Sequence, residues 1–331
     1  MNETKAPEAP DAPEAPRKLG AKAPRTRLSK LFDNRWAGLA GLLIALLAPF
    51  VNASDYALSI MTTAAIFVML ASGLNIVVGY TGLLDLGYAA FFAVGAYTSG
   101  VLATRLDLPL VATVPAVIVV TVIAGIVIGA PTLRLRSDYL AIVTLGFGEI
   151  IRITANNLPV TGGPSGIYGI PSLIDSKAGF YYVTVGVVAI AVLGASRLGR
   201  SRLGRAMRFV REDEDAAEAT GVHTYKVKLA AYIAGAVWGG LAGVLFAGQL
   251  SAISPNSFTF LYSATVLMAV VLGGMGSVPG VVLGAIVISL LPELLREAAD
   301  YRYFVFGVLL IVVMLLRPQG LWPARSKEAL K

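Results

Sequence analysis

Two charged residues inside a long apolar run are the first candidates for chemistry in this chain. Glu149 and Arg152 stand three positions apart within residues 138–155, a stretch whose composition predicts a helix. Side chains at i and i+3 share one face of a helix, so these two can form an ion pair. An ionisable group at the centre of a bilayer costs about 2.5–3.5 kcal/mol and therefore usually has a use. The pair either lines a pathway and locks two conformations, or is a structural ion pair close to the outer headgroups.

Four other polar residues lie in similarly apolar surroundings. Asp85 follows a glycine-bounded segment, residues 79–82, which is predicted to be a tight turn, and it either stabilises that turn or contacts a substrate. Asn75, Thr144 and Gln249 either line a pathway or bridge neighbouring helices. Both roles are open to polar side chains in helical membrane proteins, which often form hydrogen bonds between helices.

The sequence contains no catalytic constellation. Cysteine is absent, which excludes disulfides, thiolate metal sites and cysteine nucleophiles. The one histidine, His223, cannot form a histidine cluster, and no zinc-protease or serine-elbow motif is present. The nearest approach to a phosphate-binding loop, residues 199–204, is followed by Arg205 and Ala206 instead of a lysine and a hydroxyl residue. We therefore predict that this chain is not an enzyme and holds no metal or cofactor of its own.

The composition indicates that lipid surrounds most of these residues. Hydrophobic residues make up 56% of the 331 positions and charged residues only 14%, whereas soluble domains carry about 25% charged residues. A membrane-crossing helix needs about 20 apolar residues, so residues 36–317 have room for roughly ten. Because lipid cannot hydrogen-bond the backbone, these spans should be helices. The predicted fold class is an all-α polytopic integral membrane protein with about ten transmembrane helices. The predicted helices span residues 36–51, 56–79, 83–104, 110–130, 138–155, 180–197, 229–250, 259–274, 277–292 and 302–317.

The distribution of positive charge predicts the topology. Lysine and arginine gather in the N-terminal tail, near residues 134–136, in the loop 198–228 and in the C-terminal tail. Positive residues accumulate on the cytoplasmic side, so both termini are predicted to be cytoplasmic. The same bias accounts for the net charge of +7, and nucleic-acid binding is not expected. Residues 1–35 are predicted to be a disordered Pro/Ala-rich and then basic tail, and residues 318–331 a second cytoplasmic tail.

Two loops exceed the length of a turn. The outer loop, residues 156–179, has too much glycine and proline to be helical, yet its Ile, Tyr and Leu residues predict that it packs against the bundle. The inner loop contains residues 204–222, which are predicted to form one surface helix that ends at Gly221. That helix would carry two opposite-charge pairs, Arg208–Glu212 and Arg211–Asp215, and a face of small residues, Ala216, Ala217 and Thr220. Such a face suits insertion into a groove on another protein; the alternative is a solvated loop made basic by topology.

Close helix packing is predicted by small residues at four-residue spacing in the span 229–250. Gly235, Gly239, Gly243 and Ala247 would lie on one helix face, where they let a neighbouring backbone approach closely.

Several segments together resemble one family of transporters. The pattern Asp215-Ala216-Ala217-x-x-x-Gly221 resembles the "EAA" loop of bacterial ATP-binding-cassette (ABC) importer permeases, with Asp in place of Glu. Residues 73–97, 137–152, 156–167 and 316–323 look like the branched-chain amino-acid permeases of the LivM type. The most specific element is the turn made by Thr161, Gly162, Gly163 and Gly166. The resemblance covers roughly residues 60–323 and leaves the N-terminal extension without an assigned role.

The resemblance implies a fold, a location and a set of partners. The chain would be a multi-pass permease of the bacterial inner (cytoplasmic) membrane, carrying Leu, Ile, Val or a related hydrophobic amino acid. In this family the inner loop is a coupling helix that sits in a cleft of a cytoplasmic ATPase. That role would fall on Arg205, Arg208, Asp215, Ala216, Ala217 and Gly221. The implied partners are a second, LivH-like permease, two ABC ATPases that bind ATP and Mg, and a periplasmic substrate-binding protein.

Other functions stay open at this point. The same type of permease can carry urea or short amides. An ion-coupled secondary transporter needs acids within the membrane, and Glu149 is the only candidate well inside a predicted span. A membrane-embedded enzyme would need clustered acids, histidines or metal ligands, which the sequence lacks. Whether two identical or two different permease chains pair is also left open.

Overall fold

A computed structural model describes residues 54–135, 137–174 and 176–294, with isolated positions near each end (45–47, 49, 307, 308, 311, 315 and 320–322). All of these residues belong to one compact unit, residues 42–331. The predicted helices 36–51 and 302–317 lie mostly outside the described residues, as do both predicted tails.

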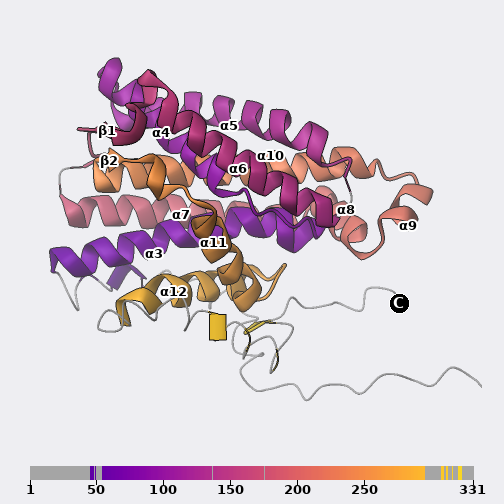
Figure 1. Cartoon of the computed structure of the whole chain (residues 1–331). Coiled ribbons are helices and arrows are strands. Elements are labelled where there is room, and N and C mark those ends of the chain that lie inside the picture. Colours follow the sequence, from indigo (N-terminus) through magenta and orange to yellow (C-terminus); the bar gives the residue numbers. More distant parts are fainter. Residues whose placement is uncertain are drawn as a thin grey trace, which may run out of the picture. The chain divides into compact units, whose positions relative to one another are not determined.

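The described unit is built mainly from helices (Figure 1). The long helices are α3 (Asp55–Leu74), α4 (Ala89–Arg105), α5 (Leu110–Thr132), α6 (Ser137–Asn157), α7 (Lys177–Arg200), α10 (Thr224–Leu250), α11 (Phe260–Gly273) and α12 (Val278–Leu294). Seven predicted helices, all except 36–51, 83–104 and 302–317, are confirmed with ends shifted by a few residues. The span predicted at 56–79 consists of α3 and a π-helical segment, η1 (Asn75–Gly79).

The predicted helix 83–104 and the tight turn before it are wrong in their boundaries. The preceding helix continues through η1 to Thr81, and α4 begins only at Ala89. Gly82 has a φ of +72°, and residues 82–88 between the two helices are not helical. A Cβ added at Gly79 would collide with Asn75 and Gly276, so this glycine permits close packing and does not end the helix. The second predicted turn, residues 273–276, is confirmed between α11 and α12.

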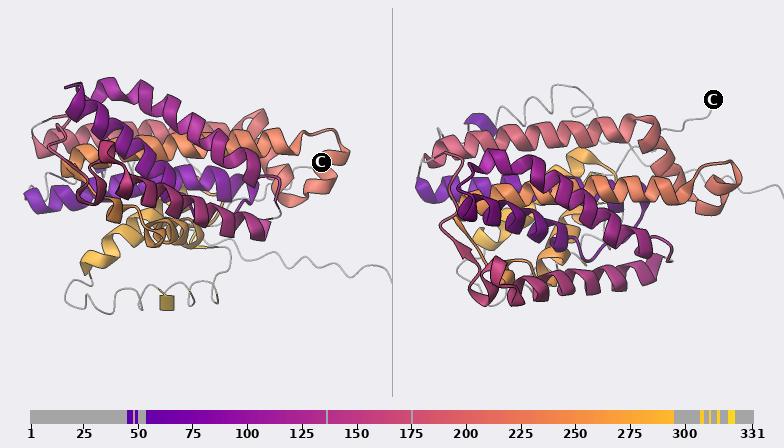
Figure 2. Two further views of the ribbon diagram at one scale, coloured as in Figure 1. Left: turned by 45° about the horizontal axis from the view of Figure 1, so that its top comes forward. Right: turned by 90° about the horizontal axis from the view of Figure 1, so that it is seen from above.

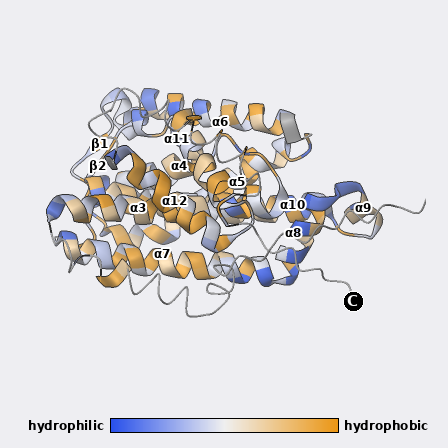
Figure 3. Ribbon diagram, turned by 90° about the horizontal axis from the view of Figure 1, so that it is seen from below, coloured by the Kyte–Doolittle hydropathy of each residue, from blue (hydrophilic) through white to orange (hydrophobic). Residues whose placement is uncertain are grey.

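Five segments of the described residues are long and apolar enough to cross a membrane. They are Asp55–Gly79, Leu110–Thr132, Lys177–Arg200, Thr224–Leu250 and Pro255–Gly273. Residues Val278–Glu293 of α12 form a shorter apolar helix. Figure 3 shows hydrophobic residues along the long helices and hydrophilic residues gathered near α8 and α9. The total of ten spans and the cytoplasmic placement of both termini stay predictions.

Helix α10 packs against α3, α4 and α5, and its small residues make this possible. A Cβ added at Gly243 would collide with the backbone of α4 at Phe92 and Ala96. At Gly235, the hydroxyl of Tyr88 donates a hydrogen bond to the backbone carbonyl across 2.9 Å. The predicted close packing through this face of α10 is therefore confirmed.

Candidate functional site

The inner loop folds into a short helical module between α7 and α10. The single helix predicted over 204–222 is wrong: the module has two helices, α8 (Arg202–Glu212) and α9 (Glu214–Ala219). The break falls at Asp213, whose extended backbone and carboxylate cap α9 by accepting the Ala216 N–H across 2.9 Å. Aspartate is a strong N-cap and its charge suits a helix N-terminus, which explains the break. The predicted stop at Gly221 is confirmed, with a φ of +88°.

The arginines of α8 bind backbone carbonyls, and the predicted pairs Arg208–Glu212 and Arg211–Asp215 are wrong. Arg208 donates to the Gly199 carbonyl in the last turn of α7. Arg211 donates to the Gly79 carbonyl at the end of η1. Carbonyls at helix C-termini lack intrahelical partners and attract cations. The module is therefore fixed to the ends of two spans.

Tyr80 also contributes to the contact between α8 and the end of α7. Its hydroxyl donates to the Ala195 carbonyl of α7 across 3.1 Å, and the Arg208 guanidinium lies over its ring at 5.9 Å from the centroid. Burial raises the pKa of Tyr80 to about 12, against the opposing effect of Arg208 and Arg200, so the hydroxyl remains a donor at neutral pH.

An ion pair with one buried member connects the module to α10. Lys228, in the second turn of α10, is 6% exposed, and its ammonium group pairs with the half-exposed Glu214 of α9. Removing Glu214 would leave the Lys228 charge buried without compensation, a change that costs about 3–5 kcal/mol in fully buried pairs and less where one member is half-exposed. This contact gives α9 a defined position on α10. Lys228 was not among the predicted site residues, although a lysine at the start of an apolar helix is a usable signal.

The small residues of α9 divide between the two sides of the helix. Ala217 is fully buried and packs in a cluster with Tyr80, Met207, Val210 and Ala231. Ala216 is half-buried. The exposed side of the module carries charged residues and the helix stop, namely Arg205, Glu212, Asp215, Glu218 and Gly221. This charged surface is the part of the module that another protein can reach.

Asn75 and Gln249 bridge helices. The Asn75 side-chain oxygen accepts the Gly276 N–H across 2.8 Å, which ties η1 to the turn between α11 and α12. The Gln249 amide donates to the Ser59 carbonyl and the Thr63 hydroxyl, each across 2.9 Å, and so joins α10 to α3.

Asp85 and Thr144 fix the non-helical segment before α4. Asp85 is fully buried, and its carboxylate accepts the Gly87 N–H across 2.8 Å. The Thr144 hydroxyl of α6 accepts the Leu86 N–H across 3.1 Å. The geometry therefore matches the turn-stabilising alternative for Asp85.

Glu149 and Arg152 form the predicted ion pair on α6. The Arg152 Nε lies 2.9 Å from one carboxylate oxygen of Glu149 and 3.0 Å from the other. The Glu149 side chain is 40% exposed and the Arg152 side chain is 25% exposed. Among the described residues, no group of three or more His, Cys, Asp or Glu is placed to hold a metal ion.

The predicted glycine turn lies directly after α6 and is held by hydrogen bonds. The Thr161 hydroxyl donates to the Ala155 carbonyl across 2.6 Å, and Gly162, Gly163 and Gly166 all have positive φ. Two 3-10 turns, η2 (Pro159–Thr161) and η3 (Gly163–Ser165), replace a regular helix here. The strand β1 (Ile167–Tyr168) then pairs antiparallel with β2 (Ala252–Ile253). The prediction that this loop packs against the bundle is confirmed, since Ile170 is 1% exposed.

Helix α10 joins these two regions. It begins just after α9 and ends just before β2, and its 27 residues separate the two ends by roughly 40 Å. Figure 1 shows α8 and α9 at one end of the long helices and the β1–β2 pair at the other, and Figure 2 gives two further views of the arrangement. A helix of this length can carry a displacement from one end to the other.

Apolar helices of membrane-crossing length, with a charged module at one end and a fixed loop at the other, define a multi-pass membrane protein. The family described as "Branched-chain amino acid transport system / permease component" matches residues 56–314, and the chain belongs to this family.

Relatives from two bacteria support this assignment. The LivM permease of the high-affinity branched-chain amino acid transport system of Salmonella typhimurium is 41% identical over 315 residues, covering 86% of this chain and 74% of the relative. The Escherichia coli LivM permease is 40% identical with the same coverage. The E. coli LivH permease is 33% identical over 119 residues, covering 35% of this chain and 38% of LivH. No solved structure matches the chain.

Proposed function

We propose that this chain is a membrane-spanning permease subunit of an ABC importer in the bacterial inner membrane. It carries Leu, Ile, Val or related hydrophobic amino acids from the periplasm to the cytoplasm. The α8–α9 module is the observation that carries the proposal. Its residues Arg208, Arg211 and Glu214 bind three elements of the bundle, namely α7, η1 and α10. Its outer side presents charges that are free to meet a second protein.

The proposed role of the α8–α9 module implies which partner proteins the chain needs. The chain has no phosphate-binding loop, so energy reaches it from two cytoplasmic ATPase subunits that bind ATP and Mg. A periplasmic binding protein delivers the amino acid. A LivH-like permease is the second membrane subunit, because the relatives include both a LivM and a LivH permease of a branched-chain amino acid transport system.

The contacts suggest how motion passes into the membrane. When the ATPases close, they displace α8 and α9 as one body. The Arg211–Gly79 contact transmits this displacement to η1 and α3, and the Lys228–Glu214 pair transmits it to α10. Packed elements with two discrete arrangements carry such coupling. In this scheme Asn75, Asp85, Thr144 and Gln249 keep the moving elements together, and Glu149 and Arg152 stabilise α6.

Charge reversal on the exposed side of α9 tests this function. Asp215 and Glu218 are exposed, and their side chains form no hydrogen bond or ion pair within the described residues. The double variant Asp215→Arg/Glu218→Arg should therefore fold normally but dock poorly. We expect ATP-driven leucine uptake in proteoliposomes with all partners to fall by at least about tenfold, a loss of roughly 1.4 kcal/mol or more.

The same reconstitution separates the alternatives. Wild-type uptake should require both ATP and the binding protein, and unlabelled isoleucine or valine should compete while urea and acetamide do not. The variant should keep the apparent Tm of the wild type. Uptake by the purified chain alone, driven by a sodium or proton gradient, would instead favour an ion-coupled transporter. Uptake by the variant at the wild-type rate would remove α9 from the docking surface.

A further inference from the structure

One exposed stripe of α7 is apolar along most of its length and ends in two arginines. It consists of Gly186, Ile190, Leu193, Arg197 and Arg200, which recur at the spacing of one helix face and are all exposed. Ile190 is 72% exposed and Leu193 is 61% exposed. Figure 3 shows the hydrophobic stretch of α7 and the hydrophilic residues near α8. Because α7 is long and apolar enough to cross a membrane, the apolar part of the stripe meets acyl chains.

The length of α7 places the two arginines at the membrane boundary. No charged residue lies between Lys177 and Arg197. A helix rises about 1.5 Å per residue, so these two cations stand about 30 Å apart along α7, which matches the thickness of the hydrocarbon core. Lys177 is paired with Asp55 across 3.0 Å, whereas Arg197 and Arg200 form no ion pair within the described residues. The α8 end of this span therefore presents two cations to the headgroup layer without a counter-charge.

Charge is segregated between the end of α7 and the acidic part of the module. Residues 197–211 contain six arginines and no acid, whereas residues 212–218 contain five acids and no base. Arg205 donates to the Arg200 carbonyl across 3.2 Å, which keeps a further guanidinium beside the end of α7. The acids of the module therefore do not neutralise the arginines of the stripe.

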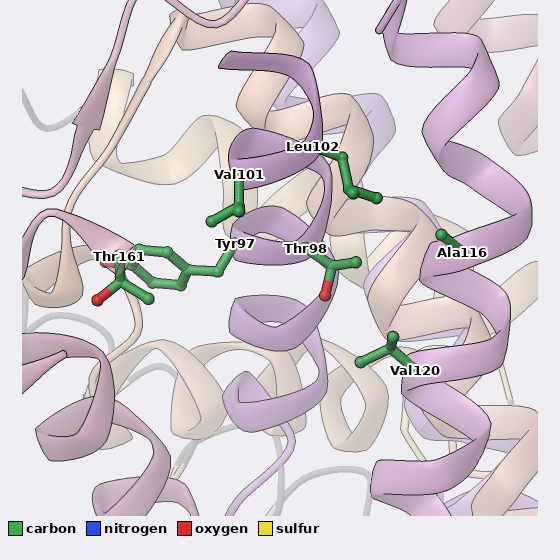
Figure 4. A pocket seen from close by; sticks show the side chains of 7 residues that line it. All are labelled: Tyr97, Thr98, Val101, Leu102, Ala116, Val120 and Thr161. Carbon is green, nitrogen blue, oxygen red and sulfur yellow. The ribbon is translucent and has the colours of Figure 1, made fainter. Parts of the chain in front are cut away.

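Another exposed apolar surface lacks this arrangement. The open hollow between α4 and α5, shown in Figure 4, is lined by Val101, Leu102, Ala116 and Val120 with a few hydroxyl groups, and by no charged side chain of the described residues. The acyl chains of any phospholipid suit such a surface. At the end of α7, guanidinium groups next to the acyl chains favour an anionic headgroup, because they form charge-assisted hydrogen bonds with phosphate oxygens.

We propose that Arg197 and Arg200 form a binding site for an anionic phospholipid whose acyl chains lie along Ile190 and Leu193. In the orientation of the proposed function this is a lipid of the cytoplasmic leaflet, where anionic headgroups attract basic segments beside the membrane. The bound lipid neutralises the end of α7 and so stabilises the corner between α7 and α8. The site requires only that α7 crosses the membrane, whereas its effect on uptake rests on the proposed function.

Lipid binding to the purified full chain in detergent tests the site. Native mass spectrometry measures bound phosphatidylglycerol, with phosphatidylcholine of the same acyl chains as the neutral lipid and glycerol 3-phosphate as the free phosphate. We expect Arg197→Gln/Arg200→Gln to lower the affinity for phosphatidylglycerol by at least about tenfold, since each basic residue near an anionic surface contributes about fivefold. Arg197→Lys/Arg200→Lys keeps both charges and should retain most of the affinity.

The matched control removes two cations elsewhere. Lys177→Gln/Lys226→Gln loses the same net charge, but Lys177 has Asp55 as its counter-charge and Lys226 lies exposed at the start of α10. This control should bind phosphatidylglycerol as the wild type does, and each variant should keep the wild-type apparent Tm without added lipid. Equal affinity of the wild type for phosphatidylcholine, equally tight binding of glycerol 3-phosphate, or unchanged affinity in Arg197→Gln/Arg200→Gln would overturn the lipid site.

Uptake in vesicles of defined composition separates the lipid site from the proposed function. The wild-type complex should transport leucine several-fold faster in phosphatidylcholine vesicles that contain phosphatidylglycerol than in phosphatidylcholine alone. Arg197→Gln/Arg200→Gln should show the lower rate in both membranes. A rate below that of the wild type in phosphatidylcholine alone, with weaker ATPase binding, would assign the arginines to the ATPase instead. If uptake is absent in both membranes while the purified chain binds phosphatidylglycerol, the proposed function fails and the lipid site stands.

Discussion

Replacing Lys228 by Glu is expected to reduce ATP-driven leucine uptake by at least about tenfold, and the second change Glu214→Lys is expected to restore most of it. The single change places two carboxylates together at a buried position, where Lys228 is 6% exposed. The module then separates from α10, although its contacts with α7 and η1 remain. The reversed pair restores the attraction with opposite polarity. Initial uptake rates in proteoliposomes measure both effects.

A second ion pair provides the control for this experiment. Lys177 and Asp55 form a bridge of 3.0 Å at the N-terminal ends of α7 and α3, with side chains 56% and 75% exposed. Exposed pairs contribute about 0–1 kcal/mol, so Lys177→Glu should change uptake by less than about threefold. If Lys228→Glu transports as well as Lys177→Glu does, or if the double reversal rescues nothing, the Lys228–Glu214 pair does not transmit the motion.

Replacing Gly166 by Ala is expected to lower the apparent Tm by roughly 5 °C and to impair uptake strongly. Gly166 has a φ of +80° and a ψ of −161°, a region that only glycine occupies freely. A Cβ there would also collide with the Ile253 carbonyl and the Ser254 backbone. The strand β1 must then move away from β2, which loosens the end of α10. Thermal unfolding in detergent and uptake assays report the two consequences.

The variant Gly169→Ala distinguishes the effect of backbone strain from the effect of a steric collision. Its φ is +73°, close to that of Gly166, but a Cβ there would meet nothing within 4 Å. Gly169→Ala should therefore cost only the left-handed strain of about 1–2 kcal/mol and leave uptake largely intact. Equal losses in the two variants would mean that the β1–β2 contact contributes nothing.

The long helices were predictable because lipid imposes a simple rule on the sequence. Residues 110–130 are apolar for the length of a bilayer, and α5 occupies Leu110–Thr132. The small face of α10 was also visible, since Gly235, Gly239 and Gly243 recur at the spacing of one helix turn. These features depend on composition and periodicity, which the sequence displays directly.

The predictions for Arg211 and Gly79 were wrong because these residues contact parts of the chain that are distant in the sequence. Arg211 had Asp215 four residues away, but the Gly79 carbonyl, 132 positions earlier, takes its guanidinium. Gly79 itself was interpreted as a turn residue, whereas it makes room for Gly276 and Asn75. Local spacing cannot reveal such contacts. The helix break at Asp213 is different, because an aspartate before three further helix-compatible residues was a usable N-cap signal.

The sequence predicted where the candidate site lies in the chain, but not the contacts that hold its two helices in place. The position of the inner loop and the pattern around Ala217 identified the module. Ala217 lies in a buried cluster with Met207 and Val210, so it packs against the protein itself and not against a partner. The role of Lys228 could not be predicted, because its partner Glu214 reaches it only when α9 packs beside α10.

We propose that the α8–α9 module lies on the cytoplasmic face, opposite the glycine turn, and is moved there by a partner ATPase. The chain has no cysteine, so single cysteines can be introduced at Glu218 and at Ser165, both of which are exposed. A membrane-impermeant maleimide should label Glu218→Cys only in inside-out vesicles and Ser165→Cys only in intact spheroplasts. Bound ATPase should protect Glu218→Cys alone. Labelling of Glu218→Cys from the periplasm, or full labelling in the presence of the ATPase, would contradict the account.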